Sequence, residues 1–430
     1  MKKIVAVIDG GGRGSALVAK YGQSPRVAKI LAIPGNDLMQ MNTKIPVQIF
    51  QTIKTTDVEK IVALCKKEQV SLVDVAHDNA VAVGLVDALQ QEGILTVGPT
   101  KAAGRIEWDK AWAREFGERH GLPQPIYHIC HSEKEGIAFI NQQPDQAWFV
   151  KAAGLAEGKG VLPAKNNEEA IEKIKEMIRF GNAGETFLLE SWLQGEEFST
   201  FICSDGKRYQ FIGIAQDHKR VDDHDEGPNT GGMGAYTPSL LITPDLQKTI
   251  QTDIFDKVID GMQKENIPYT GILYLGGMAV KQGNTLKPYV IEFNARWGDP
   301  EVQAIAPGLT NDFFEMSMAI AQGDISNIKI TTDGKTRTVV AGTSRGYPED
   351  YSQVKGKQIY GLEQARKIDG IQIYGAGVQM IKGKHIAFGG RLFYIVGEGK
   401  TIIEARQKAY EAMAVISIED NNLHYRTDIG

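Results

Sequence analysis

The sequence predicts a multidomain protein of the α/β and α+β classes, with a doubly wound parallel sheet at its N-terminus. Its 430 residues exceed what a single hydrophobic core usually holds. The first hundred residues alternate strand and helix patterns, which favours a parallel sheet covered by helices. The last hundred are rich in strand patterns and suit a small α+β domain. We therefore expect domains over residues 1–100, 101–327 and 331–430.

The composition is that of a soluble globular protein. Hydrophobic residues make up 42%, charged residues 23%, and the formal net charge is −5. This mildly acidic balance gives no support for a nucleic-acid or anionic-membrane partner. Met1-Lys2-Lys3 runs directly into an apolar strand and no apolar run approaches 18 residues, so we expect neither a signal peptide nor a membrane span. Three distant cysteines without metal-ligand spacing indicate a reducing compartment, and we expect a cytoplasmic protein (Cys65, Cys130 and Cys203).

The N-terminal elements follow from periodicity. Residues 4–8 form a continuous apolar run, which is typical of a strand buried on both faces of a parallel sheet. Thr56-x-x-Glu59 predicts a capping box that opens a helix with an apolar face. Further strands are expected over 70–76 and 94–98, on either side of a helix near 80–91.

The loop after the first strand, D-G-G-G-R-G-S over residues 9–15, is rich in glycine and opens a helix. Backbone N–H groups and the helix dipole make such a loop a natural cradle for an anion. It fits a dinucleotide fingerprint poorly, because Ser15 stands where Gly or Ala is required. The alternatives are a phosphate-bearing substrate, a tight strand-to-helix turn, and the NAD site of a dehydrogenase.

A second glycine-rich loop begins the nucleotide-binding pattern. A helix is expected over 108–120, and a strand over 147–152 carries Lys151 into G-L-A-E-G-K-G, residues 154–160. A glycine loop between paired strands can fold over a triphosphate and bring N–H groups and the Lys159 ammonium to it. No helix begins there, so the loop is not a Walker A motif. The alternative is a flexible surface hairpin.

Two more segments carry polar residues that suit substrate binding. The strand over 186–191 leads into W-L-Q-G-E-E-F-S, where residues 190–193 could line an adenine slot and Glu197 could accept from ribose hydroxyls. Otherwise Glu197 is a solvated loop charge. A-Q-D-H-K-R over 215–220 is followed by G-P-N-T-G-G-M-G-A-Y over 227–236, whose four glycines and one proline predict a functional loop rather than a helix or central strand.

The stretch V-I-E-F-N-A-R-W-G-D-P-E, residues 290–301, carries the candidate metal ligands. Strand alternation places Glu292 and Asn294 on one face, and a carboxylate beside an amide oxygen suits Mg²⁺. Arg296 points the same way if the strand continues, and could hold a phosphate or carboxylate. The alternative is a buried strand followed by a surface ion pair. The final domain is expected to hold strands near 338–343, 371–374, 385–388 and 392–396, then a helix over 402–416.

Taken together, these motifs resemble the ATP-grasp ligases, and among them the glycinamide ribonucleotide synthetase family. The match rests on A-Q-D-H-K-R with G-P-N-T-G-G-M-G-A-Y, on I-E-F-N-A-R-W-G-D-P-E, and on K-A-x-G-L-A-x-G-K-G; the closing Y-R-T-D-I-G also looks like the family's terminus. The resemblance implies a two-lobed ATP-grasp domain with its small lobe at about 120–193. It also implies a ligase that joins glycine to phosphoribosylamine with ATP and Mg²⁺ or Mn²⁺, as a monomer or dimer.

The resemblance assigns roles position by position. Metal would be held by Glu292 and Asn294. ATP would be bound by Lys110, Lys151, Gly154, Gly158, Lys159, Gly160, Glu190, Leu193 and Glu197. The catalytic candidates are Asp217, Lys219 and Arg296. Substrates would be bound by Gly12, Arg13, Asp78, Arg220, Asn229, Gly231, Gly232 and Asp299.

The sequence departs from the family in a concentrated way. The family usually reads G-G-R-E-H after the first strand and G-P-E after a later one, whereas this chain has Gly14-Ser15 and Ala76-His77-Asp78. Ala153 replaces an Asp, Gly375 replaces a His, and Gly308 and Thr310 replace basic residues. Several losses fall where the amine should bind, so one alternative is a paralogous ligase with another acceptor. Another is a nucleotide-binding protein without catalysis.

Overall fold

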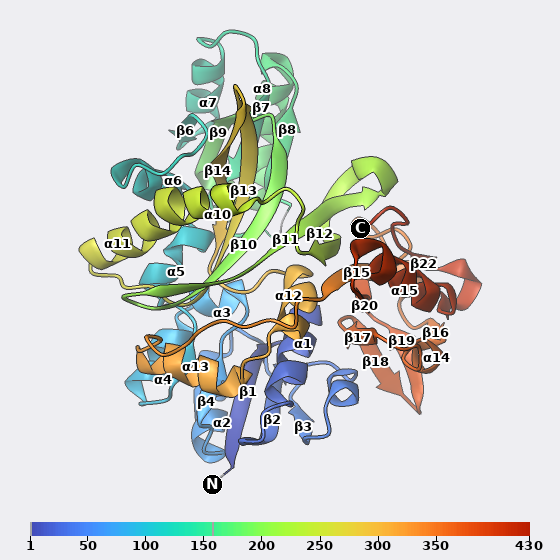
Figure 1. Ribbon diagram of the computed structural model, residues 1–430. Helices are drawn as coiled ribbons and strands as arrows, with labels where there is room; N and C mark the ends of the chain where they lie inside the picture. The colour runs from blue at the N-terminus through green and yellow to red at the C-terminus, as the bar shows by residue number, and fades with distance from the viewer. Residues whose placement is uncertain (1, 157–158) are drawn as a thin grey trace.

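The computed structural model describes residues 2–156 and 159–430. These residues form several sheets that pack with helices (Figure 1). The N-terminal sheet has five parallel strands in the order β3-β2-β1-β4-β5. Its strands are β1 (Lys3–Asp9), β2 (Val27–Pro34), β3 (Val47–Ile49), β4 (Leu72–Asp74) and β5 (Thr96–Val97). This topology confirms the predicted doubly wound parallel sheet.

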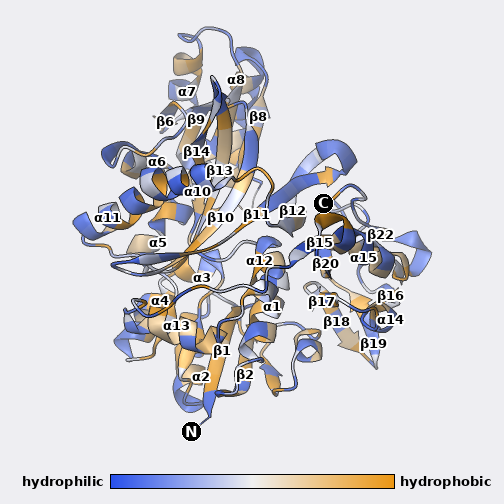
Figure 2. Ribbon diagram, in the orientation of Figure 1, coloured by the Kyte–Doolittle hydropathy of each residue, from blue (hydrophilic) through white to orange (hydrophobic). Residues whose placement is uncertain are grey.

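Helices cover both faces of this sheet. Alternate residues of β1 face opposite sides, so Val5 and Val7 pack with α1 (Gly12–Tyr21) while Ala6 and Ile8 pack on the other face. That other face is covered by α2 (Val58–Lys67), α3 (Asp78–Ala82) and α4 (Leu85–Gln91). The α1 face also receives α13 (Phe313–Gln322), a helix from the segment that the sequence placed in the middle domain (Figure 1). Figure 2 shows hydrophobic residues on both β1 and α13.

Two local predictions in this domain are corrected. The helix α2 is capped at Asp57 rather than Thr56, with no side-chain capping bond; Asp57 Oδ2 accepts instead from the Lys54 amide at 3.2 Å. The single helix expected over 80–91 is two helices, because Gly84 between them takes a left-handed φ of 85°.

A small four-stranded antiparallel sheet forms the upper part of the molecule in Figure 1, in the order β6-β9-β7-β8. It consists of β6 (Tyr127–Cys130), β7 (Trp148–Ala152), β8 (Val161–Ala164) and β9 (Phe187–Ser191). Helices α7 (Glu133–Ile140) and α8 (Asn167–Glu176) pack on it around Trp148 and Ile174, and α9 (Asn182–Glu185) follows. This layer matches the strands predicted on both sides of the second glycine loop.

A nine-stranded sheet joins the middle and C-terminal parts. Its order is β14-β13-β10-β11-β12-β15-β20-β17, with β22 beside β15. The middle strands are β10 (Glu196–Asp205), β11 (Tyr209–Asp222), β12 (Glu226–Thr237), β13 (Thr270–Gln282) and β14 (Thr285–Asn294). One face packs against α5 (Lys101–Trp108), α6 (Lys110–Arg119), α10 (Pro244–Ile250) and α11 (Asp256–Lys264), the last two joined by a π-helical turn over Gln251–Phe255. The other face packs on α12 (Glu301–Ile305) and α13.

The glycine-rich segment over 227–236 contradicts the prediction of a loop, because it is part of β12, inside this sheet. Gly234 to Thr237 pair with β15, while Asn229 pairs with Arg220 across a strong register shift. The glycines are required by close packing: a Cβ on Gly234 would lie 2.3 Å from the Val339 carbonyl oxygen. A bulged strand tolerates residues that a regular strand excludes.

The C-terminal part is a small α+β unit, as predicted. It contributes β15 (Thr336–Ser344), β17 (Ile371–Gly375), β20 (Arg391–Gly399) and β22 (Leu423–His424) to the large sheet. A second sheet holds β16 (Gln358–Tyr360), β18 (Val378–Ile381), β19 (Lys384–Ala387) and β21 (Ser417–Ile418). The short helix α14 (Leu362–Ala365) and α15 (Ile402–Ala414) pack with both sheets through residues such as Leu362, Met413 and Ile418.

The three cysteines lie in the hydrophobic interior. All three are free and buried, and burial raises the pKa of each thiol to about 12.

Within residues 2–156 and 159–430, no helix is both long and apolar enough to cross a lipid bilayer.

Candidate active site

A cleft of about 1570 Å³ brings together residues from the N-terminal sheet, the small sheet, the large sheet and the C-terminal unit. Most residues singled out in the sequence line it. They are Arg13, Asp78, Lys110, Lys151, Gly160, Glu190, Leu193, Glu197, Asp217, Lys219, Arg220, Asn229, Gly231, Glu292, Asn294, Arg296 and Asp299. Their convergence from distant parts of the chain identifies this cleft as the candidate active site.

Some predicted residues lie outside the lining. Those are Gly12, Gly154, Lys159 and Gly232, while Gly158 lies outside the described residues. A Cβ on Gly12 would lie 2.1 Å from Tyr394 Cε2, so this glycine permits close contact with the C-terminal unit. A Cβ on Gly154 would lie 2.9 Å from Ala183 Cα. Both glycines therefore pack closely against other parts of the chain.

The end of β14 presents Glu292 to the cleft. The pairing with β13 slips by one residue, so Glu292 opposes Gly276 and Val290 opposes Gly277, which leaves Ile291 as a bulge. Burial acts to raise the pKa of Glu292, but Lys219, Lys151, Lys110 and Arg296 together hold it below its usual value. The carboxylate is therefore charged among several cations.

Asn294 and Arg296 complete this end of the strand. Arg296 Nη2 donates to Asn294 Oδ1 at 2.9 Å and lies 2.9 Å from Glu107 Oε1. Glu107 Oε2 also accepts from the Ala295 amide at 2.7 Å. The last residue of β14 and the turn after it are thus fixed by α5, which keeps the Asn294 amide oxygen beside the cleft.

This donor set fits a hard divalent cation. Among the described residues, the nearest cation recorded beside Glu292 is Lys219 Nζ, at 3.8 Å from Oε1, too long for a hydrogen bond. Asn294 Oδ1 keeps a second lone pair beyond the one that Arg296 uses. One carboxylate and one amide oxygen are few ligands, and Mg²⁺ usually completes such a shell with water and phosphate.

Lys151 is held in place by Glu190 and Arg114. Its Nζ lies 2.6 Å from Glu190 Oε2, and Arg114 contacts the same carboxylate at 2.7 and 3.0 Å. Arg114 also donates to the carbonyls of Val290 and Ile291, at 3.0 and 2.7 Å. Arg114 therefore ties the small sheet to the bulge beside Glu292, and the pKa of Glu190 stays low because Arg114 and Lys151 outweigh the opposing effect of burial.

An aromatic pair stands on the same wall of the cleft. Phe149 and Trp192 stack with ring centroids 4.4 Å apart and an interplanar angle of 21°. Leu193 follows Trp192, so apolar surface adjoins the lysines. Lys110 Nζ lies 3.1 Å from the Gly154 carbonyl, and burial lowers its pKa against the opposing effect of Glu292. An apolar plate next to ammonium groups suits a nucleotide base and its phosphates.

A mixed-charge group lies across from that wall on β11. Lys219 Nζ lies 3.2 Å from Glu197 Oε2, and Glu197, Glu292 and Asp217 raise the lysine's pKa despite burial. Burial and the nearby Glu301 raise the pKa of Asp217, which lies within the same group. Arg220 Nη1 donates to the Gly227 carbonyl at 2.7 Å.

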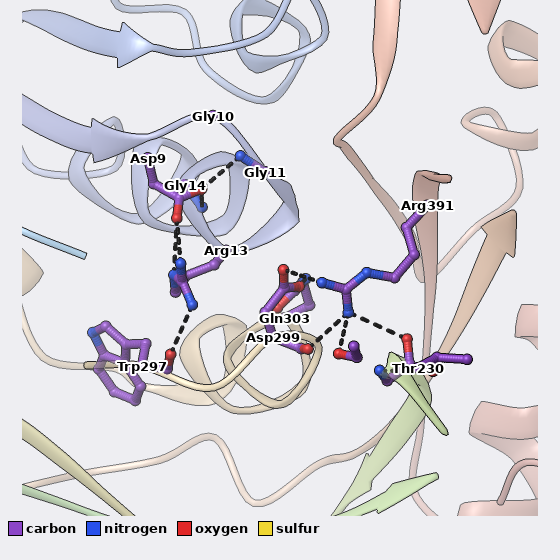
Figure 3. Close-up of polar contacts among 12 residues, drawn as sticks. Asp9, Gly10, Gly11, Arg13, Gly14, Thr230, Trp297, Asp299, Gln303 and Arg391 are labelled. Carbon is purple, nitrogen blue, oxygen red and sulfur yellow. Dashed lines mark hydrogen bonds and ion pairs between the residues drawn. The ribbon is translucent and has the colours of Figure 1, made fainter. Parts of the chain in front are cut away.

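The C-terminal unit contributes Arg391 to the cleft (Figure 3). Its Nη2 lies 3.0 Å from Asp299 Oδ2, and its Nη1 donates to the Asp299 carbonyl at 2.9 Å. Nη1 also contacts the Gly231 carbonyl of β12, and Gln303 donates to the other Asp299 oxygen at 2.6 Å. Burial acts to raise the pKa of Asp299, but Arg391 and Arg13 keep it low, so this carboxylate is charged and fixed.

The first glycine loop corrects one prediction. Its N–H groups do not form an open anion cradle, because Asp9 Oδ1 accepts from the amides of Gly11 at 2.6 Å and Gly14 at 3.1 Å (Figure 3). Arg13 contacts the other Asp9 oxygen through Nε at 2.9 Å and Nη2 at 2.6 Å. The anion in this loop is a side chain of the protein itself.

Two of the departures from the family, Ser15 and Gly375, contact each other. Ser15 Oγ donates to the Gly375 carbonyl at 2.6 Å, and Asn36 Nδ2 lies 2.9 Å from each. His77 Nδ1 lies 2.7 Å from Asp78 Oδ1 at the start of α3, and both line the cleft. Burial acts to raise the pKa of Asp78, but His77, Arg296 and Arg13 lower it.

The remaining departures, at Ala153, Gly308 and Thr310, do not line the cleft. Ala153 is buried, and its carbonyl accepts from the Lys110 amide at 2.9 Å. A Cβ on Gly308 would lie 2.8 Å from Arg337 Nη1, and the Thr310 hydroxyl lies 2.7 Å from that of Thr331.

Sequence reasoning missed four residues of the site: Asp9, Glu107, Arg114 and Arg391. Asp9 directly follows a buried strand, a place where polar residues often serve function, and that position was a usable signal. Arg114 and Glu107 lie on helices among other charged residues, where nothing local distinguishes them. Arg391 stands more than ninety residues from its partner Asp299, so only the fold reveals the pair.

Models of three domains of one protein family match most of the chain. The N domain of phosphoribosylglycinamide synthetase matches residues 3–107, its ATP-grasp (A) domain matches 108–302, and its C domain matches 337–430. A crystal structure of phosphoribosylamine–glycine ligase from Thermotoga maritima superposes with a TM-score of 0.82 at 28% identity, covering 99% of this chain and 100% of that one.

Curated relatives agree. The phosphoribosylamine–glycine ligase of Pasteurella multocida is 36% identical over 429 residues, which cover 99% of this chain and 97% of the relative. The trifunctional purine biosynthetic protein adenosine-3 of Bos taurus is 38% identical over 430 residues, and the chain spans 41% of its length. From its three matched domains and its full-length relative, the chain belongs to the phosphoribosylglycinamide synthetase family.

Proposed function

We propose that this chain is an ATP-dependent ligase that joins the carboxyl group of glycine to the amine of phosphoribosylamine. The products would be glycinamide ribonucleotide, ADP and phosphate, in the synthesis of purines. Relatives named for this ligase activity support the proposal. The observation that carries it is the charged Glu292 carboxylate beside Asn294, in the same cleft as Lys110, Lys151 and Lys219.

The chemistry follows from the low reactivity of a carboxylate. A glycine carboxylate oxygen attacks the γ-phosphorus of ATP, ADP leaves, and an acyl phosphate forms. The amine nitrogen then attacks the carbonyl carbon, phosphate leaves with the bond electrons, and the nitrogen loses a proton. Clustered cations suit the first step, because negative charge must be neutralised on the transferred phosphoryl group.

Glu292 and Asn294 are the residues that would hold Mg²⁺, with Mn²⁺ as a possible substitute. The bound ion would neutralise charge on the ATP phosphates. The protein's own part is to hold both oxygens at the end of β14, through the β14 bulge and the Glu107 contacts. Lys110 and Lys151 would hold the phosphates, while Phe149, Trp192 and Leu193 would receive the adenine and Glu197 the ribose.

Glycine would lie between the phosphates and the charged groups of β11 and of the turn after β14. Its ammonium group would face the charged Asp299 or donate to the Asp217 carboxyl group, and its carboxylate would face Lys219, Arg220 or Arg296. These pairings follow charge complementarity. The substrates are thus small molecules, and we keep the expectation of a cytoplasmic monomer or dimer without nucleic-acid or membrane partners.

The second candidate is a ligase of the same chemistry that uses another amine. The observation that favours it is the crowding of acidic groups on the acceptor side of the cleft, where Asp9, Asp78 and Asp299 all line the wall. A dehydrogenase is disfavoured, because Asp9 occupies the amides that would receive the pyrophosphate of NAD.

Coupled measurement of ADP release tests the proposal. Purified protein with ATP, Mg²⁺, glycine and phosphoribosylamine should release ADP, and omission of either glycine or the amine should abolish release. Turnover with other amines but not with phosphoribosylamine would replace the first candidate by the second. ATP binding without glycine-dependent ADP release under any amine would leave only a nucleotide-binding protein.

A further inference from the structure

The first glycine loop has the form of an anion site, yet it already contains an anion. The loop follows β1, and α1 begins at Gly12, so its amides point out of a ten-residue helix. Asp9 is only 1% exposed, and its two oxygens accept four hydrogen bonds from this loop: two from the amides of Gly11 and Gly14, and two from Arg13 (Figure 3).

Each nitrogen of the Arg13 guanidinium already has a protein partner. Two of its nitrogens contact Asp9, and the third, Nη1, donates to the Trp297 carbonyl at 3.2 Å. Arg13 is 7% exposed as a residue, and the ion pair neutralises its charge. A phosphate arriving at this loop would meet a carboxylate and a guanidinium already paired with it, and displacing Asp9 would leave its charge buried without partners.

The neighbouring arginines are engaged in the same way. Arg296 is paired with Glu107 and bonded to Asn294, and Arg391 is paired with Asp299. Asp78 adds a further carboxylate to this side of the cleft. The wall around the loop therefore offers carboxylates and neutralised guanidinium groups.

We propose that Asp9 is a specificity-determining residue, whose carboxylate takes the place of a ligand anion in the glycine loop. The part of the acceptor that meets this loop then carries no phosphate, and is a neutral or cationic polar group such as a hydroxyl or an ammonium. Calling the ligand an acceptor amine rests on the proposed ligase function; the closure of the loop to anions rests on Asp9 alone.

The loop sequence is built around this arrangement. A Cβ on Gly14 would lie 2.9 Å from both Cβ and Oδ1 of Asp9. An aspartate at position 9 therefore requires glycine at position 14, where the family usually carries a larger residue. On the other side, Asn36 Nδ2 donates to the Gly10 carbonyl at 3.0 Å and fixes the loop.

Calorimetric titration of the full chain with ribose and ribose 5-phosphate tests the proposal. The wild-type ratio of the two affinities is the reference, because the phosphate of the proposed acceptor must be bound elsewhere in the cleft. Asp9→Gly frees two amides and Arg13, and should raise the preference for ribose 5-phosphate over ribose at least tenfold above the wild-type ratio. Asp9→Asn keeps the volume and frees only the arginine charge, so a smaller gain in the same direction is expected. Asp260→Asn, on the exposed side of α11, should match wild type.

The outcomes separate cleanly. Folded Asp9 variants that keep the wild-type ratio of the two affinities would overturn the proposal. Circular dichroism and thermal unfolding establish that each variant is folded; if Asp9→Gly does not fold, Asp9→Asn decides. Glycine-dependent ADP release, measured separately, tests the ligase function, so its absence would remove the acceptor interpretation while the binding result still decides the role of Asp9.

Discussion

Lys151 Nζ lies 2.6 Å from Glu190 Oε2, and this buried ion pair joins two neighbouring strands of the small sheet. The same carboxylate accepts from Nε and Nη2 of Arg114, and Nη2 also donates to the Ile291 carbonyl in the bulge beside Glu292. One glutamate therefore sets the position of a candidate phosphate-binding lysine relative to the candidate metal ligands. The sequence suggested a nucleotide contact for Glu190, which lines the cleft, and the contacts observed add a positioning role.

Replacing Glu190 by Gln should weaken ATP binding and stability together. The substitution leaves Arg114 and Lys151 without a charged partner in a buried place, which should cost roughly 3 kcal/mol of unfolding free energy. The displaced lysine should raise the dissociation constant of ATP about tenfold. Chemical denaturation and calorimetry measure the two effects. The exposed Glu185→Gln serves as control, and unchanged ATP affinity in a folded Glu190→Gln protein would contradict the positioning role.

Replacing Arg391 by Lys should impair glycine binding more than ATP binding. A lysine cannot bridge the Asp299 carboxylate and the carbonyls of Asp299 and Gly231 at once. We expect the KM for glycine to rise about tenfold, with the KM for ATP within twofold of wild type. Steady-state kinetics measure both, and Arg366→Lys on the surface of the same unit is the control. Equal changes in both constants would point to a general structural defect.

Asp74 should make stability depend on pH. Burial raises its pKa from 3.8 to about 7, against the lowering effect of the Tyr21 hydroxyl at 2.8 Å. Because the folded state holds this proton more tightly than the unfolded state, the carboxyl group destabilises the fold increasingly as pH rises from about 4 to 7. Asp74→Asn should therefore stabilise the protein by roughly 3 kcal/mol at pH 8 and by almost nothing at pH 4.

Denaturant unfolding of Asp74→Asn across this pH range is the measurement. Asp260→Asn should show no such trend. A stabilisation that is constant with pH, or that grows toward acid, would contradict the assigned direction.

Gly14→Ala should be more harmful with Asp9 than without it. In an ordinary helix this change stabilises by about 0.5–1 kcal/mol, but here the new Cβ would lie 2.9 Å from the Asp9 side chain. We expect a loss of roughly 1–3 kcal/mol in the wild-type background. In the Asp9→Gly background part of the loss should disappear, with a coupling energy of about 1 kcal/mol in a double-mutant cycle. Additive effects would show that the two positions are independent.

Local patterns sufficed for much of the fold. The apolar runs of β1, β7 and β9 and the periodicity of α15 depend on neighbours in sequence, and each was predicted close to its observed limits; the end of β14 was also predicted, but the strand begins earlier, at Thr285. The prediction of a loop over 227–236 was wrong, because glycines of this segment allow close packing against Val339 and Pro300, which lie far away in the chain. The prediction of one continuous helix over 80–91 was wrong, because a single left-handed residue, Gly84, interrupts an otherwise helical pattern.

Some residues of the candidate site could be predicted from local sequence, and others could not. Glu292 and Asn294 were predictable, since strand alternation alone brings two oxygen ligands to one face. Arg391 and Arg114 were not, because each acts through a partner more than seventy residues away. The filled glycine loop was also hidden: the sequence shows the amides and the aspartate, but only the fold shows the aspartate turned back onto them.

The central claim is that Glu292 and Asn294 let this chain convert the glycine carboxyl group into an acyl phosphate. Trapping with hydroxylamine tests it most directly, because hydroxylamine captures an acyl phosphate without any acceptor amine. Wild-type protein should form glycine hydroxamate only with ATP, glycine and Mg²⁺ present, and a chelator should abolish the product. Glu292→Ala should lower the rate at least a hundredfold while the exposed-site variant Glu185→Gln keeps it. Absence of hydroxamate from the wild type, or an undiminished rate in Glu292→Ala, would contradict the account.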